Sequence, residues 1–245
     1  MSLFVIADLH LSADSDHPMD VFGSRWCGYT EKLVKNWRSI VNDTDTVIVP
    51  GDVSWAMHLA DAKADFKLLD SLPGQKYLGK GNHDFWWETA SKMGRFLEEN
   101  QIRSLHFLYN NAYALDDFIV CGTRGWFLEE GQQQTVGDVD YAKIVNREVG
   151  RLKLSLDAAV ALRKGEHAEK EILVFLHFPP VWNGFECREI LELLASYGIR
   201  RCYHGHIHGI YHAPRTRQIG NLSLTMISAD FLDFCPLRIL PTDFK

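Results

Sequence analysis

The sequence predicts an α/β fold, because short β-rich runs alternate along the chain with amphipathic helical patterns. Near the N-terminus, an apolar run at 3–7 precedes a helical pattern at about 30–41, and a run at 46–50 precedes one at 54–72. Alternation of this kind is typical of a sheet layered with helices. At 245 residues, the chain is long enough to bury most of its apolar surface without disulfides or metal.

The remaining elements of the first half follow from the same rules. The first helical pattern has Thr30 in the position of an N-cap, and the Pro-Gly pair at 73–74 ends the second before a strand at 76–79. A third helix is expected to begin at Asp84, which has a side chain suited to capping it. Three apolar runs then predict the short strands of a meander, at 104–109, 112–115 and 118–123. The sheet is therefore expected to turn partly antiparallel after residue 103.

The second half begins with a polar loop at 129–138 and a long helical pattern from Asp138 to Arg163. The loop is the best candidate for a mobile lid, within a possible lid or insertion at about 124–165, although a solvated connection explains it too. No linker marks a domain boundary, so one domain is expected over 1–245. The other expected elements are a buried strand at 172–177, a helix at 189–198, a strand, loop and strand at 201–213, and strands at 222–228 and 237–240.

Composition and charge narrow the functional classes. The net charge of -6 argues against non-specific binding to nucleic acid or membrane, since both partners are anionic. The five cysteines are scattered without a C-x-x-C pair, which argues against a disulfide framework or a thiolate zinc site. The N-terminus lacks the pattern of a signal peptide, and no apolar segment approaches the about 20 residues that cross a bilayer. We therefore expect a cytoplasmic protein.

Polar residues follow several of the apolar strands, where their desolvation is costly. Each has a plain explanation as a turn, cap or loop residue, but in open α/β sheets ligands bind just outside the carboxyl ends of the strands. Because these residues converge on such ends, we expect a functional site there. They are Asp8 and His10 after the first strand, Asp52 after the second, Asn82 and His83 after the third, His177 after a later one, and His206 and His208 in a Gly-flanked loop.

The side chains in this set indicate which ions they suit. Seven of these eight groups are two carboxylates, an amide oxygen and four imidazoles, and none of the eight is a thiolate. Such ligands suit Mn²⁺, Fe²⁺, Zn²⁺ or Co²⁺ better than Ca²⁺ or an all-oxygen Mg²⁺ site. Seven such groups exceed the three or four that a single catalytic ion needs beside its open position. They fit two divalent ions that share a carboxylate.

The order of these motifs carries a family resemblance. The set DLH, GD, GNHD, H and GHIH, between residues 8 and 208, resembles the signature of the calcineurin-like metallophosphoesterase superfamily: D-x-H, G-D, G-N-H-[DE], H and G-H-x-H. The phrases ADLHLS, GDVSWAM, RGW and SADFL are also similar to an uncharacterised bacterial branch of predicted phosphohydrolases. The resemblance implies a four-layer α/β-β/α sandwich with mixed sheets and with metals above the strand ends.

The resemblance also implies roles for individual residues. His83 would be a non-ligand that protonates the leaving oxygen or binds the phosphate, and Asp84 would orient that imidazole or merely cap the following helix. The implied ligands are Asp8, His10 and His208 on one ion, Asn82, His177 and His206 on the other, and Asp52 between the two.

The implied activity is that of a metal-dependent phosphohydrolase. Two ions lower the pKa of a bound water to about 7 and hold both the attacking and the leaving oxygen, so that a metal-bridging hydroxide attacks phosphorus in line. The expected substrate is a small phosphomonoester or phosphodiester. The alternatives are a nuclease or nucleotide phosphodiesterase, which the acidic charge disfavours, and a non-catalytic scaffold on the same fold, which typically loses ligands that are all present here.

Two further positions bear on the substrate. Phosphoprotein phosphatases of this superfamily usually extend the second motif to G-D-x-x-D, whereas this chain has Trp55 at that place, which weakens the interpretation as a protein phosphatase. Arg124, after the strand at 118–123, has the planar fork that matches phosphate oxygens, but a structural salt bridge is the more common role for such a residue. Aromatic residues beside the motifs pack the core or line a substrate pocket.

Overall fold

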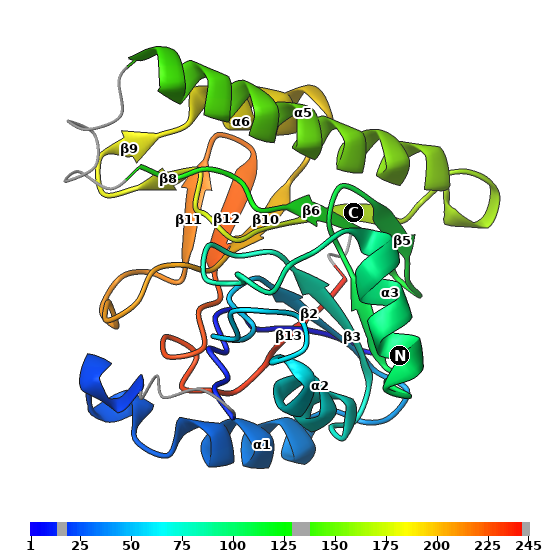
Figure 1. Cartoon of the computed structure of the whole chain (residues 1–245). Coiled ribbons are helices and arrows are strands. Elements are labelled where there is room, and N and C mark those ends of the chain that lie inside the picture. Colours follow the sequence, from blue (N-terminus) through cyan, green and yellow to red (C-terminus); the bar gives the residue numbers. More distant parts are fainter. Residues whose placement is uncertain (14–18, 129–137, 242–245) are drawn as a thin grey trace.

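The computed structural model describes residues 1–13, 19–128 and 138–241, which form two mixed sheets with helices on their outer faces (Figure 1). Within these residues the first sheet has the strand order β13-β1-β2-β3-β4, and only β13 runs antiparallel to its neighbour. Its strands are β1 (Leu3–Val5), β2 (Thr46–Pro50), β3 (Gln75–Gly79), β4 (Leu105–Phe107) and β13 (Leu237–Ile239).

The second sheet has the order β11-β12-β10-β7-β6-β5, with a parallel centre and antiparallel edge strands. A separate small hairpin joins β8 (Val181–Trp182) to β9 (Phe185–Glu186). The strands of the second sheet are β5 (Ala112–Ala114), β6 (Phe118–Thr123), β7 (Glu171–Leu176), β10 (Arg201–His204), β11 (Thr216–Ile219) and β12 (Leu222–Met226).

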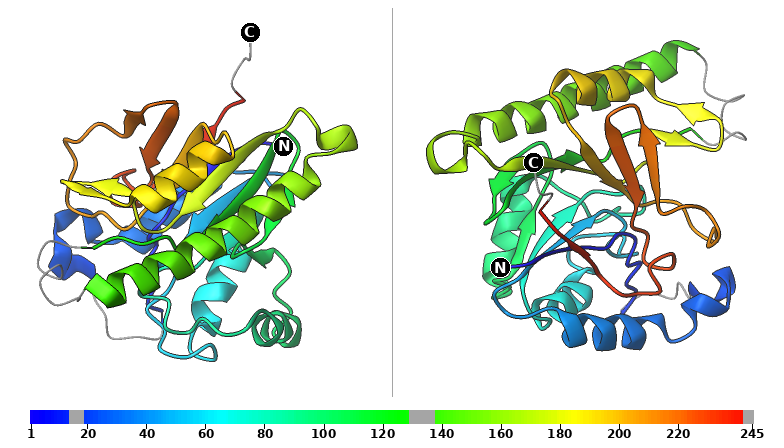
Figure 2. Two further views of the ribbon diagram at one scale, coloured as in Figure 1. Left: turned by 90° about the horizontal axis from the view of Figure 1, so that it is seen from above. Right: turned by 180° about the vertical axis from the view of Figure 1, so that it is seen from behind.

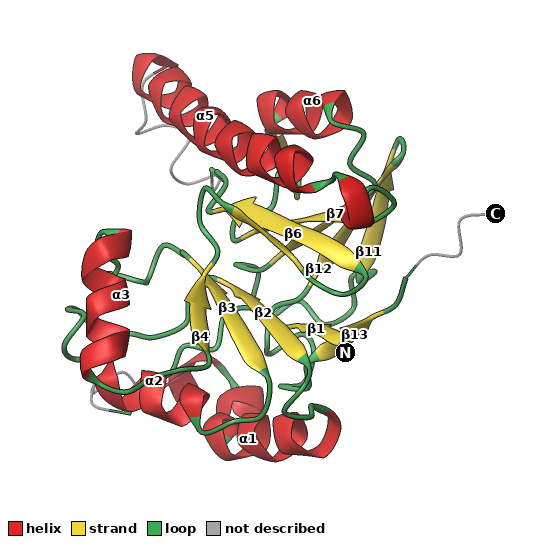
Figure 3. Cartoon of the chain, turned by 90° about the vertical axis from the view of Figure 1, so that its right-hand side faces the viewer, coloured by secondary structure: helices red, strands yellow, loops and turns green. Residues whose placement is uncertain are grey.

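Helices form the two outer layers, as Figure 3 shows with the sheets in yellow between helices in red. The first sheet is covered by α1 (Tyr29–Ile40), α2 (Lys63–Asp70) and α3 (Ala90–Glu99), and the second by α5 (Asp138–Leu162) and α6 (Arg188–Ser196). The 3-10 turns η1 (Met19–Phe22), η2 (Ser24–Trp26) and η3 (Gly165–His167) complete the described elements. The predicted four-layer α/β-β/α sandwich is confirmed, and the views of Figure 2 show the same layers from above and behind.

The apolar runs arise because alternate side chains of each inner strand enter different layers. On β1, Phe4 packs beneath the helices of the first sheet, while Val5 faces the second sheet. On β7, Phe175 packs in the same layer as Val5, and Val174 packs beneath α5 and α6. Since both faces of each sheet are covered, the central strands have apolar residues at nearly every position.

Several helix boundaries differ from the predicted ones. Helix α1 has Gly28 as its N-cap, with φ of 60°, so Thr30 already lies inside the helix. Helix α2 is much shorter than the predicted 54–72, because the residues before it form turns and a bridge. Helix α3 has Thr89 as its N-cap. The expectation that this helix begins at Asp84 is therefore wrong.

The predicted meander is wrong in its pairing. Strand β4 runs parallel to β3 in the first sheet, whereas β5 and β6 form an antiparallel pair in the second. The chain crosses from one sheet to the other between residues 107 and 112. Similarly, the second strand expected within 201–213 begins only at Thr216, because the residues after β10 form a long loop.

Part of the segment 124–165, which was predicted as a possible lid or insertion, forms helix α5 in the outer layer over the second sheet. Helix α5 ends within one residue of the predicted 138–163 pattern, and it packs on β5, β6 and α6. Residues 129–137, the core of the predicted lid loop, lie outside the described residues. Among the described helices, none combines the length and the apolar character needed to span a bilayer.

Candidate metal centre

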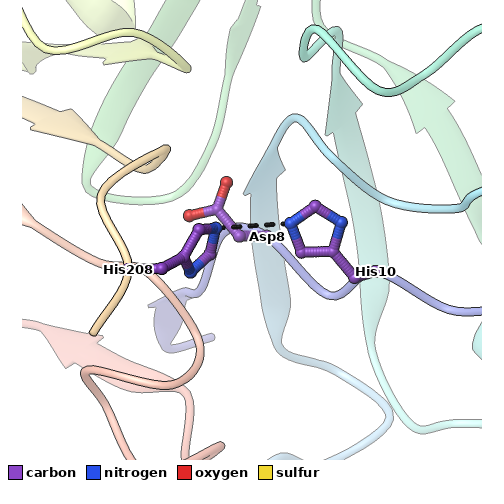
Figure 4. Close-up of side chains that lie close together, drawn as sticks. All are labelled: Asp8, His10 and His208. Atoms are coloured by element: carbon purple, nitrogen blue, oxygen red, sulfur yellow. Dashed lines mark hydrogen bonds between the residues drawn. The ribbon is translucent and has the colours of Figure 1, made fainter. Parts of the chain in front are cut away.

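The predicted site residues come together because the parallel strands of both sheets direct their carboxyl ends to one edge. Ligand atoms of Asp8, His10 and His208 all lie within 4.8 Å of one another. Figure 4 shows this group, with the Nε2 atoms of the two imidazoles 3.3 Å apart. Residue 8 follows β1 of the first sheet and residue 208 follows β10 of the second. The group is therefore built across both sheets.

A second group lies beside the first. Ligand atoms of Asp52, His177 and His206 also lie within 4.8 Å of one another. The amide oxygen of Asn82 is 2.6 Å from Nε2 of His177, which adds Asn82 to this group. All seven ligands predicted from the sequence are thus placed in two neighbouring groups, with the division that the resemblance implies.

A single carboxylate lies between the two groups. The Oδ2 atom of Asp52 is 3.6 Å from Nε2 of His10 in the first group and 3.5 Å from Nε2 of His177 in the second. Its Oδ1 atom accepts a hydrogen bond of 2.8 Å from the backbone N–H of His83. Asp52 therefore presents one oxygen to both groups while the other is held by the backbone.

The protonation states of these residues fit a divalent cation. Burial raises the pKa of Asp8 to about 6 and lowers that of His206 to about 3. Burial also lowers the pKa of His177 well below its usual value, and neutral imidazole is the form that binds metals. Among the described residues, Oδ1 of Asp8 and Nδ1 of His177 face each other at 3.4 Å without hydrogen-bond partners. A cation would compensate such buried groups.

The backbone is strained at the same residues. Asp8, His10, Asp52 and His206 have positive φ values of 61°, 47°, 50° and 71°. A left-handed backbone at a residue other than glycine costs of the order of 1–3 kcal/mol and clusters at functional sites. Four such residues among seven candidate ligands indicate that the surrounding structure enforces this arrangement.

The glycines of the motifs have a steric role that the sequence patterns do not explain. A Cβ atom on Gly81 would lie 2.0 Å from Oδ1 of Asp52, and one on Gly205 would lie 2.5 Å from Oδ2 of Asp8. Distances below 3.0 Å are not tolerated by real Cβ atoms. Glycine is thus required at these two positions because the carboxylates of the candidate centre occupy the space of a side chain.

Asp84 supports the loops under the centre. Its two oxygens accept hydrogen bonds from the Nε1 of Trp86 and from four backbone N–H groups, those of Asp52, Val53, Ser54 and Gly81. Burial raises the pKa of this carboxyl to about 6. The helix-cap alternative is wrong, and both oxygens are directed at the backbone and at Trp86 rather than at the imidazole of His83.

The variant Asp84→Ala should therefore destabilise the protein strongly. Five donors lose their acceptor, and unsatisfied buried donors cost about 1–3 kcal/mol each before relaxation and water entry, so we expect a net loss of roughly 3 kcal/mol or more. The measurement is the midpoint of urea unfolding. Glu88→Ala is the control, because Glu88 is 44% exposed and pairs with the exposed Lys92, and it should change the free energy of unfolding by less than about 1 kcal/mol. Equal effects would contradict the role of Asp84.

Two residues near the centre were not assigned by the sequence analysis. Asp230, which is fully buried, hydrogen bonds Nδ1 of His208 at 2.9 Å and accepts from the backbone N–H of Gly209 at 2.9 Å. A carboxylate on Nδ1 leaves Nε2 to face the centre, as is usual for metal-binding histidines. Trp55 stacks on His10 with ring centroids 5.0 Å apart. The sequence signal that could have identified Asp230 is a carboxylate between the apolar residues Ala229 and Phe231.

His83 lies beside the groups rather than in either of them. Its ring centroid is 4.3 Å from that of Trp55 and 5.6 Å from that of His10. Burial and the charge of His208 lower its pKa. The imidazole is thus placed next to the candidate ligands, held by a backbone bond to Asp52.

Arg124 takes part in a salt bridge. Its guanidinium lies 3.5 Å from the carboxylate of Glu148, a fully buried residue of α5 that also pairs with Arg151. The backbone oxygen of Arg124 accepts hydrogen bonds from the N–H groups of His177 and Phe178. The structural role weighed in the sequence analysis is therefore present, and Arg124 also borders the strand end that carries His177.

The two groups of candidate ligands at the strand ends are of a kind that can hold divalent ions. A family model described as calcineurin-like phosphoesterase matches residues 1–209. The chain belongs to this family, and it is an enzyme that hydrolyses phosphoester bonds.

Solved structures share the fold at low sequence identity. The phosphopantetheinyl hydrolase PptH from Mycobacterium tuberculosis is 14% identical with a TM-score of 0.57, over 100% of this chain and 97% of that one. TT1561 of Thermus thermophilus is 12% identical with a TM-score of 0.55, over 97% of each chain. A protein of unknown function from Aquifex aeolicus, AQ665, is 13% identical with a TM-score of 0.51, over 97% and 95%. No curated protein matches the sequence.

Proposed function

We propose that this enzyme hydrolyses a small phosphomonoester or phosphodiester at a centre of two divalent ions. The observation that supports this most directly is the position of Asp52, whose Oδ2 atom lies about equally far from His10 and His177 in the two groups. A carboxylate shared in this way suits a pair of ions rather than two separate sites. The donor set favours Mn²⁺, Fe²⁺, Zn²⁺ or Co²⁺.

The residues of the centre would have two roles, as metal ligands and as positioning residues. When bound, the ions supply a nucleophilic oxygen from water near pH 7 and stabilise the charge on the phosphoryl oxygens. Asp84 and Asp230 are positioning residues, because each holds a loop that carries candidate ligands. The ligands would be Asp8, His10 and His208 for one ion, Asn82, His177 and His206 for the other, and Asp52 for both.

Two further residues would act on the substrate. His83 protonates the leaving oxygen or donates a hydrogen bond to the phosphate, since its ring lies next to the candidate ligands without belonging to either group. Arg124 would contribute less: its side chain is 21% exposed, so it could bind a phosphate oxygen while it pairs with Glu148.

The proposed activity is tested with mono- and bis-(p-nitrophenyl) phosphate. We expect chelator-treated protein to be inactive and Mn²⁺ to restore hydrolysis, with two ions per chain by metal analysis. Higher activity on the monoester or on the diester would assign the ester class. Absence of turnover with metal shown to be bound would refute the proposal.

A further inference from the structure

An apolar pocket adjoins the candidate metal centre. The cavity has a volume of about 600 Å³, and two of the residues that line it are His206 and His208, one from each ligand group. Pockets of 300–1,000 Å³ are of the size that holds small ligands. The pocket therefore begins at the centre, and a phosphoryl group held there has its substituent within reach of the pocket.

Aromatic side chains from separate segments form the wall. Phe22 comes from η1, Phe127 from the segment after β6, and Trp182 and Phe185 from the small β8–β9 hairpin. In Figure 1, β8 and β9 lie on the same side of the molecule as the orange loop that follows β10. The wall is therefore formed by segments that are far apart in the sequence.

The rings continue from the centre into the pocket. The ring centroid of Phe127 is 5.5 Å from that of His206 on one side and 5.1 Å from that of Phe185 on the other, both in edge-to-face arrangement. Edge-to-face contacts are favourable between aromatic groups, so a further ring is readily accommodated among them. A planar apolar group next to the centre would extend this series.

None of the described residues that line the wall carries a formal charge. Apart from the two imidazoles and the indole of Trp182, the only polar side chain among the described lining residues is that of Asn183. Phe22 and Ile210, which line the pocket, are 63% and 45% exposed. An anionic group, such as a second phosphate, would find no cation among the described lining residues, and Arg217, 4.9 Å from the Trp182 ring centroid, is not one of them.

We propose that this pocket binds the leaving group of the substrate and that this group is an uncharged aromatic one. The proposal rests on the proposed phosphoesterase function, and it adds the chemical class of the leaving group. An aryl or similarly flat apolar phosphoester would place its phosphoryl group on the centre and its ring between Phe22, Phe127 and Phe185. Esters with additional charges on the leaving group would bind less well.

The test compares phenyl phosphate, 2-naphthyl phosphate and a carboxyphenyl phosphate as substrates. We expect the native enzyme to hydrolyse the naphthyl ester with a kcat/KM about tenfold above that of the phenyl ester, and the charged ester less well than the phenyl ester. In Phe22→Ala and Phe185→Ala the preference for the naphthyl ester should fall to about twofold or less. Val21→Ala is the matched control, because Val21 is 73% exposed on the same turn as Phe22 but does not line the pocket.

A second measurement needs no metal and no turnover. Binding of a fluorinated 2-naphthol to chelator-treated protein is followed by fluorine NMR, and we expect binding by the native protein and Val21→Ala, with at least a fivefold weaker affinity in Phe22→Ala and Phe185→Ala. Equal rates for the phenyl and naphthyl esters, or naphthol affinity that is the same in all variants, would overturn the pocket assignment. If no ester is hydrolysed while naphthol binds as expected, the proposed function fails and the pocket stands.

Discussion

The variant Asp52→Asn should lose nearly all activity and should not retain two ions per chain. The Oδ2 atom of Asp52 lies between the two ligand groups, so replacing the carboxylate by a neutral amide should weaken metal binding at both sites. Changing residues that merely orient a metal ligand typically costs about 10–100-fold in affinity or activity, so a residue shared by two ions should cost at least about a hundredfold. Metal analysis and initial rates with p-nitrophenyl phosphate measure the two effects.

Asp45→Asn is the matched control for this variant. Asp45 is also a buried aspartate, 5% exposed, and it precedes β2 whereas Asp52 follows that strand. Its carboxylate accepts hydrogen bonds from the backbone N–H groups of Ser2 and Asn42, remote from the ligand groups. We expect Asp45→Asn to be less stable but to keep its ions and its specific activity. If Asp52→Asn binds two ions as tightly as the native protein, the shared-carboxylate arrangement is wrong.

His83→Gln should lower kcat by about 10²–10⁴-fold, the usual contribution of general acid catalysis, while the metal content is unchanged. The ions should stay because the contact between residue 83 and Asp52 is made by the backbone N–H, which every variant except proline retains. Glutamine keeps a hydrogen-bond donor but cannot deliver a proton. If the imidazole protonates the leaving oxygen, the loss should be larger for phenyl phosphate than for p-nitrophenyl phosphate, whose leaving group needs less protonation.

An equal loss for the two esters would assign His83 to phosphate binding instead, and the unchanged rate of a His83→Ala enzyme would remove it from the mechanism. The control is His106→Ala. His106 is another partly buried imidazole whose pKa is lowered by burial. It lies on β4, outside both ligand groups, and its ring forms a hydrogen bond with Gln75. We expect that variant to keep native kcat.

The alternation of strands and helices was predicted from the sequence, and the family resemblance implied the layers and the candidate ligands. Apolar runs and helical periodicity predicted the α/β pattern, because burial of both sheet faces leaves a strong signal in strands such as β1 and β7. The family resemblance grouped all seven candidate ligands as the structure does. Most of those residues come shortly after an apolar strand, and His206 and His208 lie in the Gly-flanked loop that follows β10.

The failures share a physical cause: they concern contacts between distant segments. Asp84 was expected to orient the imidazole of His83 or to cap a local helix, but its partners at 52–54 come from another strand end. Asp230 binds His208 across 22 positions of the chain. The parallel pairing of β4 with β3 was likewise hidden, because a short strand does not reveal its neighbour. Local patterns specify elements, whereas these pairings depend on the tertiary arrangement.

The candidate ligands are drawn from both sheets, which has a consequence for the whole molecule. Asp8, Asp52 and Asn82 follow strands of the first sheet, while His177, His206 and His208 follow strands of the second. The backbone N–H of His206 also donates to Asp8 across this seam at 2.8 Å. Any cation bound here cross-links the two halves of the sandwich. Binding of the cation then stabilises the contact between the two halves, so the free energy of unfolding should rise with the concentration of free metal ion.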